Sequence, residues 1–309
     1  MQRELLLKAA RSPMLRTRAE RSRVARPVVQ RFVAGQSQLE ASAAVAKLLS
    51  DGLLVTLDYL GEDTTTADQA ATTVAAYRSM LAALADSGFA DRAEVSVKLS
   101  AIGQSLPAGD GEKIALDGAR QICEAAAAAG TTVTLDMEDH TTTDSTLSIV
   151  QELRADFPWV GAVLQAYLKR TLGDCQDLAV TGSRIRLCKG AYAEPESVAY
   201  RGDAVEDSYR RCLNVLLGGK GYPMIASHDP AMIAVARRLA LTHQRTPDSY
   251  EFQMLYGIRP EEQLAIAAGG NRMRVYVPYG DEWYGYFMRR LAERPANLAF
   301  FLRSLTSRS

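Results

Sequence analysis

Two adjacent arginines near the end of the chain could bind an anion. Residues 285–297 read GYFMRRLAERPAN, and their polar members fall at positions i, i+3, i+4 and i+7, on one face of a helix: Tyr286, Arg289, Arg290 and Glu293. Apolar residues that can pack on the other side are Trp283, Phe287, Leu291 and Leu298. Guanidinium groups match the geometry of carboxylate and phosphate oxygens. Because an exposed cluster of ion pairs has the same spacing, the spacing alone leaves both interpretations open.

Polar residues also recur where short apolar runs of the sequence end. They are Asp58, Lys98, Asp136, Glu138, Asp139, Gln165, Arg186, Lys189, His228, Gln253 and Tyr276. One such residue is commonly a helix cap or a turn former, but recurrence at almost every run favours a shared site. Three of these residues are cations, and Tyr192 and Tyr286 add to the aromatic groups nearby. Together with the arginine pair they suit a small anionic substrate, a phosphate-bearing cofactor, or both.

Motifs of several other site classes are missing from the sequence. Neither G-x-G-x-x-G nor G-x-x-x-x-G-K-[ST] occurs, and neither H-E-x-x-H nor G-x-S-x-G is present. The chain holds only three histidines, so we expect no metal site. Its four cysteines show no C-x-x-C spacing, which argues against a disulfide framework and a structural zinc site and fits a reducing cytosol.

The charge of the chain is balanced overall but uneven at its start. Lysine and arginine total 36, as do aspartate and glutamate, so no nucleic-acid partner is expected. Residues 1–31 hold an excess of basic groups, which could contact anionic lipid or a partner. We favour a solvated face of N-terminal helices instead. No apolar stretch reaches the length of a transmembrane helix.

The elements that must position these residues alternate between strand and helix. Short apolar runs at 53–57, 95–99, 132–137, 161–165, 185–188, 223–227, 250–255 and 274–277 predict eight strands. Helical periodicity lies between them, for example at 67–85, 113–129, 143–155, 204–217 and 230–241. This alternation predicts a (βα)8 barrel with its chemistry at the carboxyl ends of the strands. We expect an N-terminal helical extension at residues 1–45 and a barrel catalytic domain at residues 46–309.

Six stretches resemble the proline dehydrogenase family: VSVKLSAIG, LDMEDHTTTDST, LQAYLKR, RIRLCKGAY, EFQMLYGIR and RVYVPYGDEWYGYFMRRLAERPAN. They occur in order, and the likeness runs from about residue 53 to residue 297. The resemblance, to monofunctional bacterial members, implies a distorted (βα)8 barrel that holds FAD non-covalently, with the last helix over its mouth. It implies oxidation of L-proline to Δ1-pyrroline-5-carboxylate by hydride transfer from C5 to flavin N5, as the first step of proline catabolism. Electrons would pass to a membrane quinone.

The resemblance also implies roles for individual residues. Those expected to bind proline are Lys98, Tyr276, Tyr286, Arg289 and Arg290. Those expected to be catalytic are Asp136 and Arg186. Those expected to contact FAD are Met137, Gln165, Arg186, Lys189, Gly190, Ala191, Ser227 and His228. A carboxylate beside cations is a poor base, so we expect Asp136 to orient Lys98 or Arg186 rather than to abstract a proton.

Two departures from the family pattern bear on the cofactor contacts. Ser227, His228 and Asp229 stand where Thr-His-Asn is common, and Cys188 stands where an aliphatic residue is usual. Both changes are small and leave the expected reaction class untouched.

Two other classes of function fit parts of the same pattern. One is a lysine-dependent aldolase in which Lys98 forms a Schiff base. The other is a non-catalytic ligand-binding barrel, or a regulator that uses the basic N-terminal arm. For the dehydrogenase we expect a cytoplasmic protein with peripheral association at the inner membrane that holds the quinone. The sequence leaves open the oligomeric state, the choice of quinone and whether hydroxyproline is a substrate.

Overall fold

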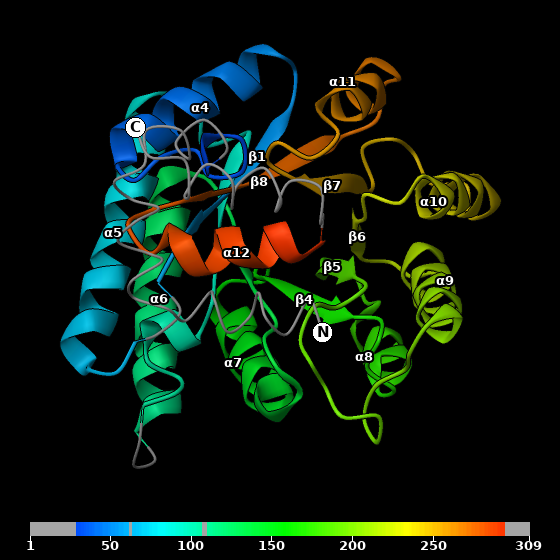
Figure 1. The fold of residues 1–309 in the computed structure, drawn as a ribbon, viewed down its shortest axis with the longest axis horizontal. Coiled ribbons are helices and arrows are strands. Elements are labelled where there is room, and N and C mark those ends of the chain that lie inside the picture. The colour runs from blue at the N-terminus through cyan, green and yellow to red at the C-terminus, as the bar shows by residue number, and fades with distance from the viewer. Residues whose placement is uncertain (1–28, 62–63, 107–109, 294–309) are drawn as a thin grey trace, which may run out of the picture.

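Eight parallel strands close into a barrel (Figure 1). The computed structural model describes residues 29–61, 64–106 and 110–293. The strands are β1 (Leu54–Tyr59), β2 (Ala93–Val97), β3 (Val133–Leu135), β4 (Gly161–Gln165), β5 (Arg184–Cys188), β6 (Tyr222–Ala226), β7 (Glu251–Leu255) and β8 (Met273–Tyr279). They follow one another in sequence order around the barrel, and β8 closes it by pairing with β1, where Leu54 lies opposite Arg274. The predicted (βα)8 fold and its eight strands are confirmed.

Helices surround the barrel and form the outer layer (Figure 1). They are α4 (Gln38–Ser50), α5 (Ala67–Asp86), α6 (Gly111–Ala129), α7 (Thr143–Asp156), α8 (Thr171–Leu178), α9 (Asp203–Gly218), α10 (Pro230–Thr242) and α11 (Pro260–Ala268), and α12 (Trp283–Glu293) follows the last strand. Two short 3-10 helices, η1 (Ser100–Ile102) and η2 (His140–Thr142), follow β2 and β3. The last helix, α12, crosses the mouth of the barrel, as expected. Residues 1–28 lie outside the described residues, and the predicted division at residue 45, a position within α4, stays a prediction.

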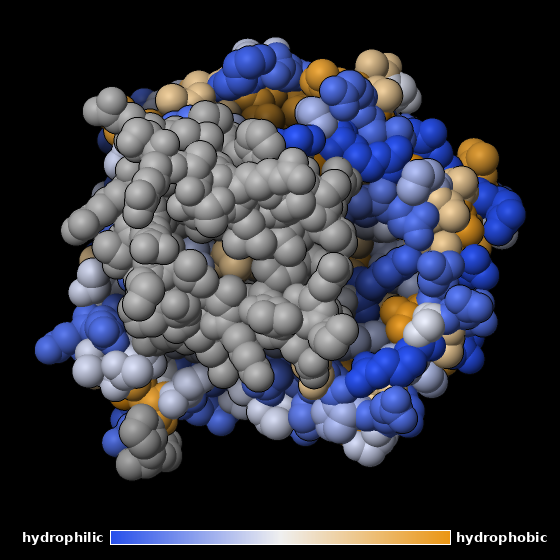
Figure 2. Space-filling model, in the orientation of Figure 1, coloured by the Kyte–Doolittle hydropathy of each residue, from blue (hydrophilic) through white to orange (hydrophobic). Residues whose placement is uncertain are grey.

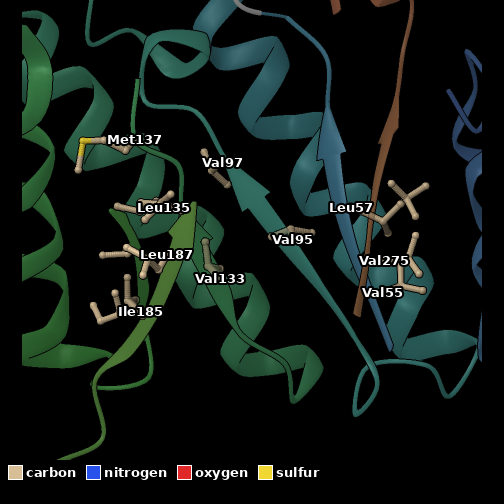
Figure 3. Packing of buried hydrophobic residues seen from close by; sticks show 14 of the residues in the cluster. Val55, Leu57, Val95, Val97, Val133, Leu135, Met137, Ile185, Leu187 and Val275 are labelled. Atoms are coloured by element: carbon tan, nitrogen blue, oxygen red, sulfur yellow. The ribbon is translucent and has the colours of Figure 1, made fainter. Parts of the chain in front are cut away.

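The apolar core lies between the barrel and the helices. Alternate residues of each strand point outward, as Val55 and Leu57 of β1 and Val95 and Val97 of β2 do (Figure 3). These side chains are fully buried, and each contributes about 1.5–3 kcal/mol by leaving water. On the outer surface hydrophilic residues predominate across the described part of the face in Figure 2, with hydrophobic ones scattered among them.

The interior of the barrel is charged rather than apolar. Glu94 of β2 is 1% exposed there and accepts hydrogen bonds from Arg184 Nη2 at 2.5 Å and from Thr132 Oγ1 at 2.6 Å. The guanidinium nitrogens of Arg186 and Arg274 lie 3.9 and 3.8 Å from the same carboxylate. Burial raises the pKa of Glu94, but these three arginines outweigh burial and lower the pKa to about 2. The interior therefore carries a compensated ion network that fixes arginines toward the barrel axis.

Replacing Glu94 by glutamine is expected to lower the free energy of unfolding by about 3–5 kcal/mol at neutral pH, because buried arginines lose their counterion. The pKa of this group is depressed from its ordinary value of 4.5 to about 2 in the fold. The contribution of Glu94 to the free energy of unfolding is therefore complete above pH 4.5 and disappears as the pH falls toward 2. Urea unfolding of wild type and Glu94→Gln across this range should show the difference shrinking with acid. Glu124→Gln on the exposed face of α6 is the control; an equal loss there would contradict the prediction.

Candidate active site

The carboxyl ends of the strands bring together most of the polar residues that were predicted to end the apolar runs. Asp58 lies in β1, Gln165 ends β4, Arg186 lies in β5, Gln253 in β7 and Tyr276 in β8. Three further residues come directly after their strands, namely Lys98, Asp136 and Lys189, and His228 lies two residues after the end of β6. Parallel strands all end at one mouth of the barrel, so residues far apart in sequence converge there.

Arg186 is the centre of this group and is 4% exposed. Its Nη1 donates to Asp136 Oδ1 at 2.7 Å and to Ser96 Oγ at 2.9 Å. Its Nε donates to Gln253 Oε1 at 2.5 Å, and the guanidinium lies 5.3 Å from the centre of the Tyr276 ring. Three strands and an aromatic face therefore hold a single orientation of the guanidinium. Nη2 is buried and has no hydrogen-bond partner among the described residues.

Asp136 is an acceptor from several sides. Besides Arg186, Ser96 Oγ donates to Oδ1 at 2.8 Å and Tyr276 OH donates to Oδ2 at 2.7 Å. Burial, followed by the charges of Asp136 and Asp58, holds the pKa of Tyr276 well above its usual value, so the phenol stays a donor. Of the two cations that Asp136 was expected to orient, its hydrogen bond goes to Arg186.

Tyr276→Phe should slow turnover roughly 10-fold, because it removes one hydrogen bond to a charged group and leaves the ring beside Arg186. Steady-state kinetics measures the turnover, and urea unfolding measures the stability of the variant. Tyr222→Phe is the matched control, since it removes a tyrosine hydrogen bond to the Glu251 carboxylate in the barrel interior. Equal slowing in both variants would show that turnover falls because the fold is perturbed and not because the hydrogen bond to Asp136 is lost.

Lys98 forms a second charged centre with a different partner. Its Nζ lies 2.6 Å from Asp58 Oδ2, and the Asp58 side chain is fully buried. The hydroxyl of Tyr77 lies 3.4 Å from Asp58 Oδ1, and burial together with this carboxylate raises the pKa of Tyr77 well above its usual value. The site therefore presents two cations, Lys98 and Arg186, each aligned by its own aspartate.

Several of the predicted cofactor residues gather beyond β5 and β6. Lys189 Nζ lies 2.9 Å from Asp229 Oδ2 and 3.2 Å from Glu206 Oε1. Burial alone would lower the pKa of Lys189, but its hydrogen bonds to these carboxylates raise it. Asp229 also caps α10 by accepting from Ala231 N at 2.9 Å. The lysine is thus held as a cation at the end of β5.

The residues that follow β6 are fixed by the neighbouring strand. His228 Nε2 accepts from the backbone N–H of Leu255 at 3.0 Å, which leaves the ring hydrogen on Nδ1. Ser227 Oγ accepts from Asp229 N at 3.1 Å. Burial raises the pKa of the Cys188 thiol to about 12, so this departure from the family pattern adds no reactive thiolate.

Backbone and amide groups form the rest of the expected cofactor set. Gly190 has φ +109°, and Ala191 follows it on an exposed segment. Gln165 Nε2 donates to the carbonyl of Glu138 at 2.7 Å, and Met137 lies buried beside β3. The Tyr167 ring lies where a side chain of residue 190 would begin, with an added Cβ only 2.3–2.6 Å from its atoms, so this position requires glycine.

Two of the predicted strand-end residues, Glu138 and Asp139, act mainly within the loops. Glu138 accepts from Ser100 Oγ at 2.6 Å and from Ser100 N at 3.0 Å, which joins the loops after β2 and β3. Asp139 Oδ1 accepts from Thr141 N at 2.8 Å and caps η2. These are the cap and turn functions that a single strand-end carboxylate usually has.

The predicted arginine pair lies in α12. The described side chains of this helix end at Met288, so the side chains of Arg289 and Arg290 lie outside the described part. Phe287 is fully buried, with its ring centre 6.2 Å from that of Phe32 and 5.9 Å from that of Trp283. Tyr286 is 7% exposed, whereas Tyr192 is 38% exposed on the loop after β5. The expected packing of Trp283 and Phe287 is confirmed.

The family model for proline dehydrogenase matches residues 41–303. The chain belongs to the proline dehydrogenase family. Membership of this family makes it an oxidoreductase of proline catabolism. Proline dehydrogenase of Deinococcus radiodurans is 41% identical over 281 residues, which cover 90% of each chain. Proline dehydrogenase 1 of Bacillus subtilis (strain 168) is 39% identical over 277 residues, 89% of this chain and 90% of the relative.

A solved structure of proline utilization A from Bdellovibrio bacteriovorus, inactivated by N-propargylglycine, has the same fold. It superimposes with a TM-score of 0.80 at 26% identity and covers 87% of this chain. The family member described here spans 33% of that longer chain.

Two further properties bear on ligands and location. Within the described ranges no three His, Cys, Asp or Glu side chains gather as ligands for a metal ion. None of the helices in the same part of the chain is both long and apolar enough to cross a membrane.

Proposed function

We propose that this chain oxidises L-proline to Δ1-pyrroline-5-carboxylate with a non-covalently bound FAD and passes the electrons to a membrane quinone. The observation that carries the proposal is the fixed Arg186, aligned by Asp136, Ser96 and Gln253 at the carboxyl mouth of the barrel. Its buried Nη2 lies 3.9 Å from the Glu94 carboxylate, so the same guanidinium also connects this site with the ion network of the barrel interior.

The residues present fit a flavin dinucleotide. Lys189 supplies a cation suited to a phosphate, and Gly190, which follows it, has φ +109° and turns the backbone at the end of β5. Gln165, Met137, Ala191, Ser227 and His228 complete the set that would hold the cofactor. When bound, FAD supplies the acceptor for the hydride that leaves C5 of proline.

The protein's own residues would position proline and stabilise charge. Lys98, Arg289 and Arg290 would bind the carboxylate and fix the ring in one pose, which accounts for much of the barrier reduction in such reactions. Tyr276 and Tyr286 would pack on the ring. Arg186 would stabilise the negative charge that reduction creates, and Asp136 would orient Arg186.

The visible spectrum of the purified protein tests the proposal directly. We expect a yellow protein that absorbs near ~450 nm and is bleached by L-proline under anaerobic conditions. Colour that persists with proline would overturn the reaction, and borohydride trapping of a substrate on Lys98 would favour the aldolase. The ion pair of Lys98 with Asp58 weighs against that alternative, since a charged ammonium is not a nucleophile.

Arg289→Met tests the carboxylate clamp separately. The KM for proline should rise roughly 10- to 100-fold while the flavin spectrum stays intact, because charge-assisted hydrogen bonds to the substrate are lost. Arg211→Met on the exposed face of α9 is the control for loss of one positive charge. A near-normal KM in Arg289→Met would remove the clamp from the proposal.

A further inference from the structure

Glu194 is a buried carboxylate in the loop that joins β5 to α9. This residue is only 4% exposed, although its neighbours on the loop face solvent. Its Oε1 accepts from the backbone N–H of His140 at 2.9 Å and from the hydroxyl of Tyr167 at 3.1 Å. Its Oε2 forms a short hydrogen bond with His140 Nδ1. One carboxylate therefore joins the loops that follow β3, β4 and β5.

The backbone of the same loop is fastened to the end of β4. Tyr167 N donates to the carbonyl of Lys189 at 2.9 Å, and Tyr200 N donates to the carbonyl of Tyr167 at 2.7 Å. The start and the end of the loop thus meet at one tyrosine. The ring of Tyr167 also lies against Gly190, where an added Cβ would come within 2.3 Å of Cδ1.

Burying a carboxylate in a surface loop is unfavourable unless hydrogen bonds compensate it. Glu194 has three of them, and all three come from other loops at the barrel mouth. Within its own loop the contact is a backbone one, in which Arg201 Nη2 donates to the Glu194 carbonyl. The side chain is therefore arranged to fix the position of the loop and not to stabilise its internal turn.

We propose that Glu194 is a positioning residue that holds Lys189, Gly190 and Ala191 in the geometry that binds FAD. The inference rests on the proposed function, which gives those three residues their role. A loop held in its binding conformation loses less entropy when the ligand binds, so fixing the loop raises the affinity for the cofactor. Once FAD is bound, proline binding and the chemical step should depend little on Glu194.

Glu194→Ala should raise the dissociation constant for FAD roughly 10- to 100-fold, because charge-assisted hydrogen bonds that order the loop are lost. Titration of the FAD-free protein with FAD, followed by flavin fluorescence, measures the constant. At saturating FAD, kcat and the KM for proline should stay near wild type. Amide hydrogen exchange of residues 189–202 in the FAD-free protein should become faster.

Three variants keep the test independent of folding. Glu194→Gln should restore most of the affinity, because its amide oxygen can accept from His140 N while its NH2 donates to the other tautomer of the His140 ring. Tyr167→Phe keeps the ring against Gly190 and removes one donor, so it should have a smaller effect than Glu194→Ala. Glu196→Ala, two residues away and exposed, should leave the constant unchanged.

The outcomes separate this inference from the proposed function. If wild type binds FAD and Glu194→Ala binds it equally well with a lower melting temperature, Glu194 is only structural and the inference is overturned. A comparable loss of affinity in Glu196→Ala would also overturn it. A wild-type protein that binds no FAD would overturn the cofactor assignment itself and, with it, the role given to Glu194.

Discussion

Arg186→Met is expected to lower kcat for proline oxidation roughly 10²- to 10³-fold, the size of effect seen when a preorganised donor to developing charge is removed. Arg186 is held by hydrogen bonds to Asp136, Ser96 and Gln253, so its positive charge needs no reorganisation during the reaction. Methionine fills a similar volume but carries neither the charge nor the donors. Single-turnover reduction of the FAD-loaded variant by proline measures the change.

The same variant should also be less stable, by about 3–5 kcal/mol, because Asp136 and Glu94 each lose a buried cation. Arg184→Met is a matched control on the same strand, since Arg184 also pairs with Glu94, at 2.5 Å, but makes no contact with Asp136 among its described hydrogen bonds. It should lose comparable stability and keep kcat within a few-fold. If Arg184→Met slows the reaction as much as Arg186→Met, the loss of kcat results from destabilisation of the fold and not from removal of the Arg186 charge.

Arg186→Lys separates charge from geometry. A lysine keeps the positive charge but has one ammonium, which cannot reach Gln253 on one side and Asp136 on the other as the guanidinium fork does. We expect part of the stability to return and most of the loss in kcat to remain. Full recovery of kcat would show that charge alone is sufficient at this position.

The barrel could be predicted from the sequence because its outward positions are regular. Val55, Leu57, Val95 and Val97 alternate with residues that face the barrel axis, and a period of two with β-branched side chains is the pattern of a strand. The ends of elements shifted by a few residues, as at β8, which runs to Tyr279 beyond the predicted end at residue 277. Pairing with β1 extends this strand, and such pairing is not visible in a local pattern.

The strand-end residues of the site could be predicted for the same reason, whereas their partners could not. Asp58 and Asp136 were both visible at strand ends, but only the three-dimensional structure pairs Lys98 with Asp58 and Arg186 with Asp136. Ser96 was missed, although it faces the barrel axis two positions before Lys98, and counting alternate residues of β2 would have found it.

Glu194 could not have been found by such counting. It lies on a loop, where no periodicity relates sequence to direction, and its partners His140 and Tyr167 are 54 and 27 residues away. A glutamate in a loop is usually exposed, so the residue type predicts an exposed side chain and not a buried one. Whether a loop carboxylate is buried depends on contacts between loops, which form only when the barrel brings their ends together.

Gly190→Ala is expected to remove most of the affinity for FAD, with a dissociation constant raised roughly 100-fold or more, because about 3 kcal/mol of strain must be relieved by moving the loop. The backbone has φ +109°, and an added Cβ would come within 2.3–2.6 Å of the Tyr167 ring. Gly182→Ala is the matched control, since it has φ +79° with nothing within 4 Å of the added atom. It shares the backbone strain without the clash and should leave FAD binding unchanged. Adding Tyr167→Leu to Gly190→Ala should recover part of the affinity, because the smaller side chain makes room for the methyl group. Wild-type affinity in Gly190→Ala would show that the close approach of Gly190 and Tyr167 is not needed for the cofactor.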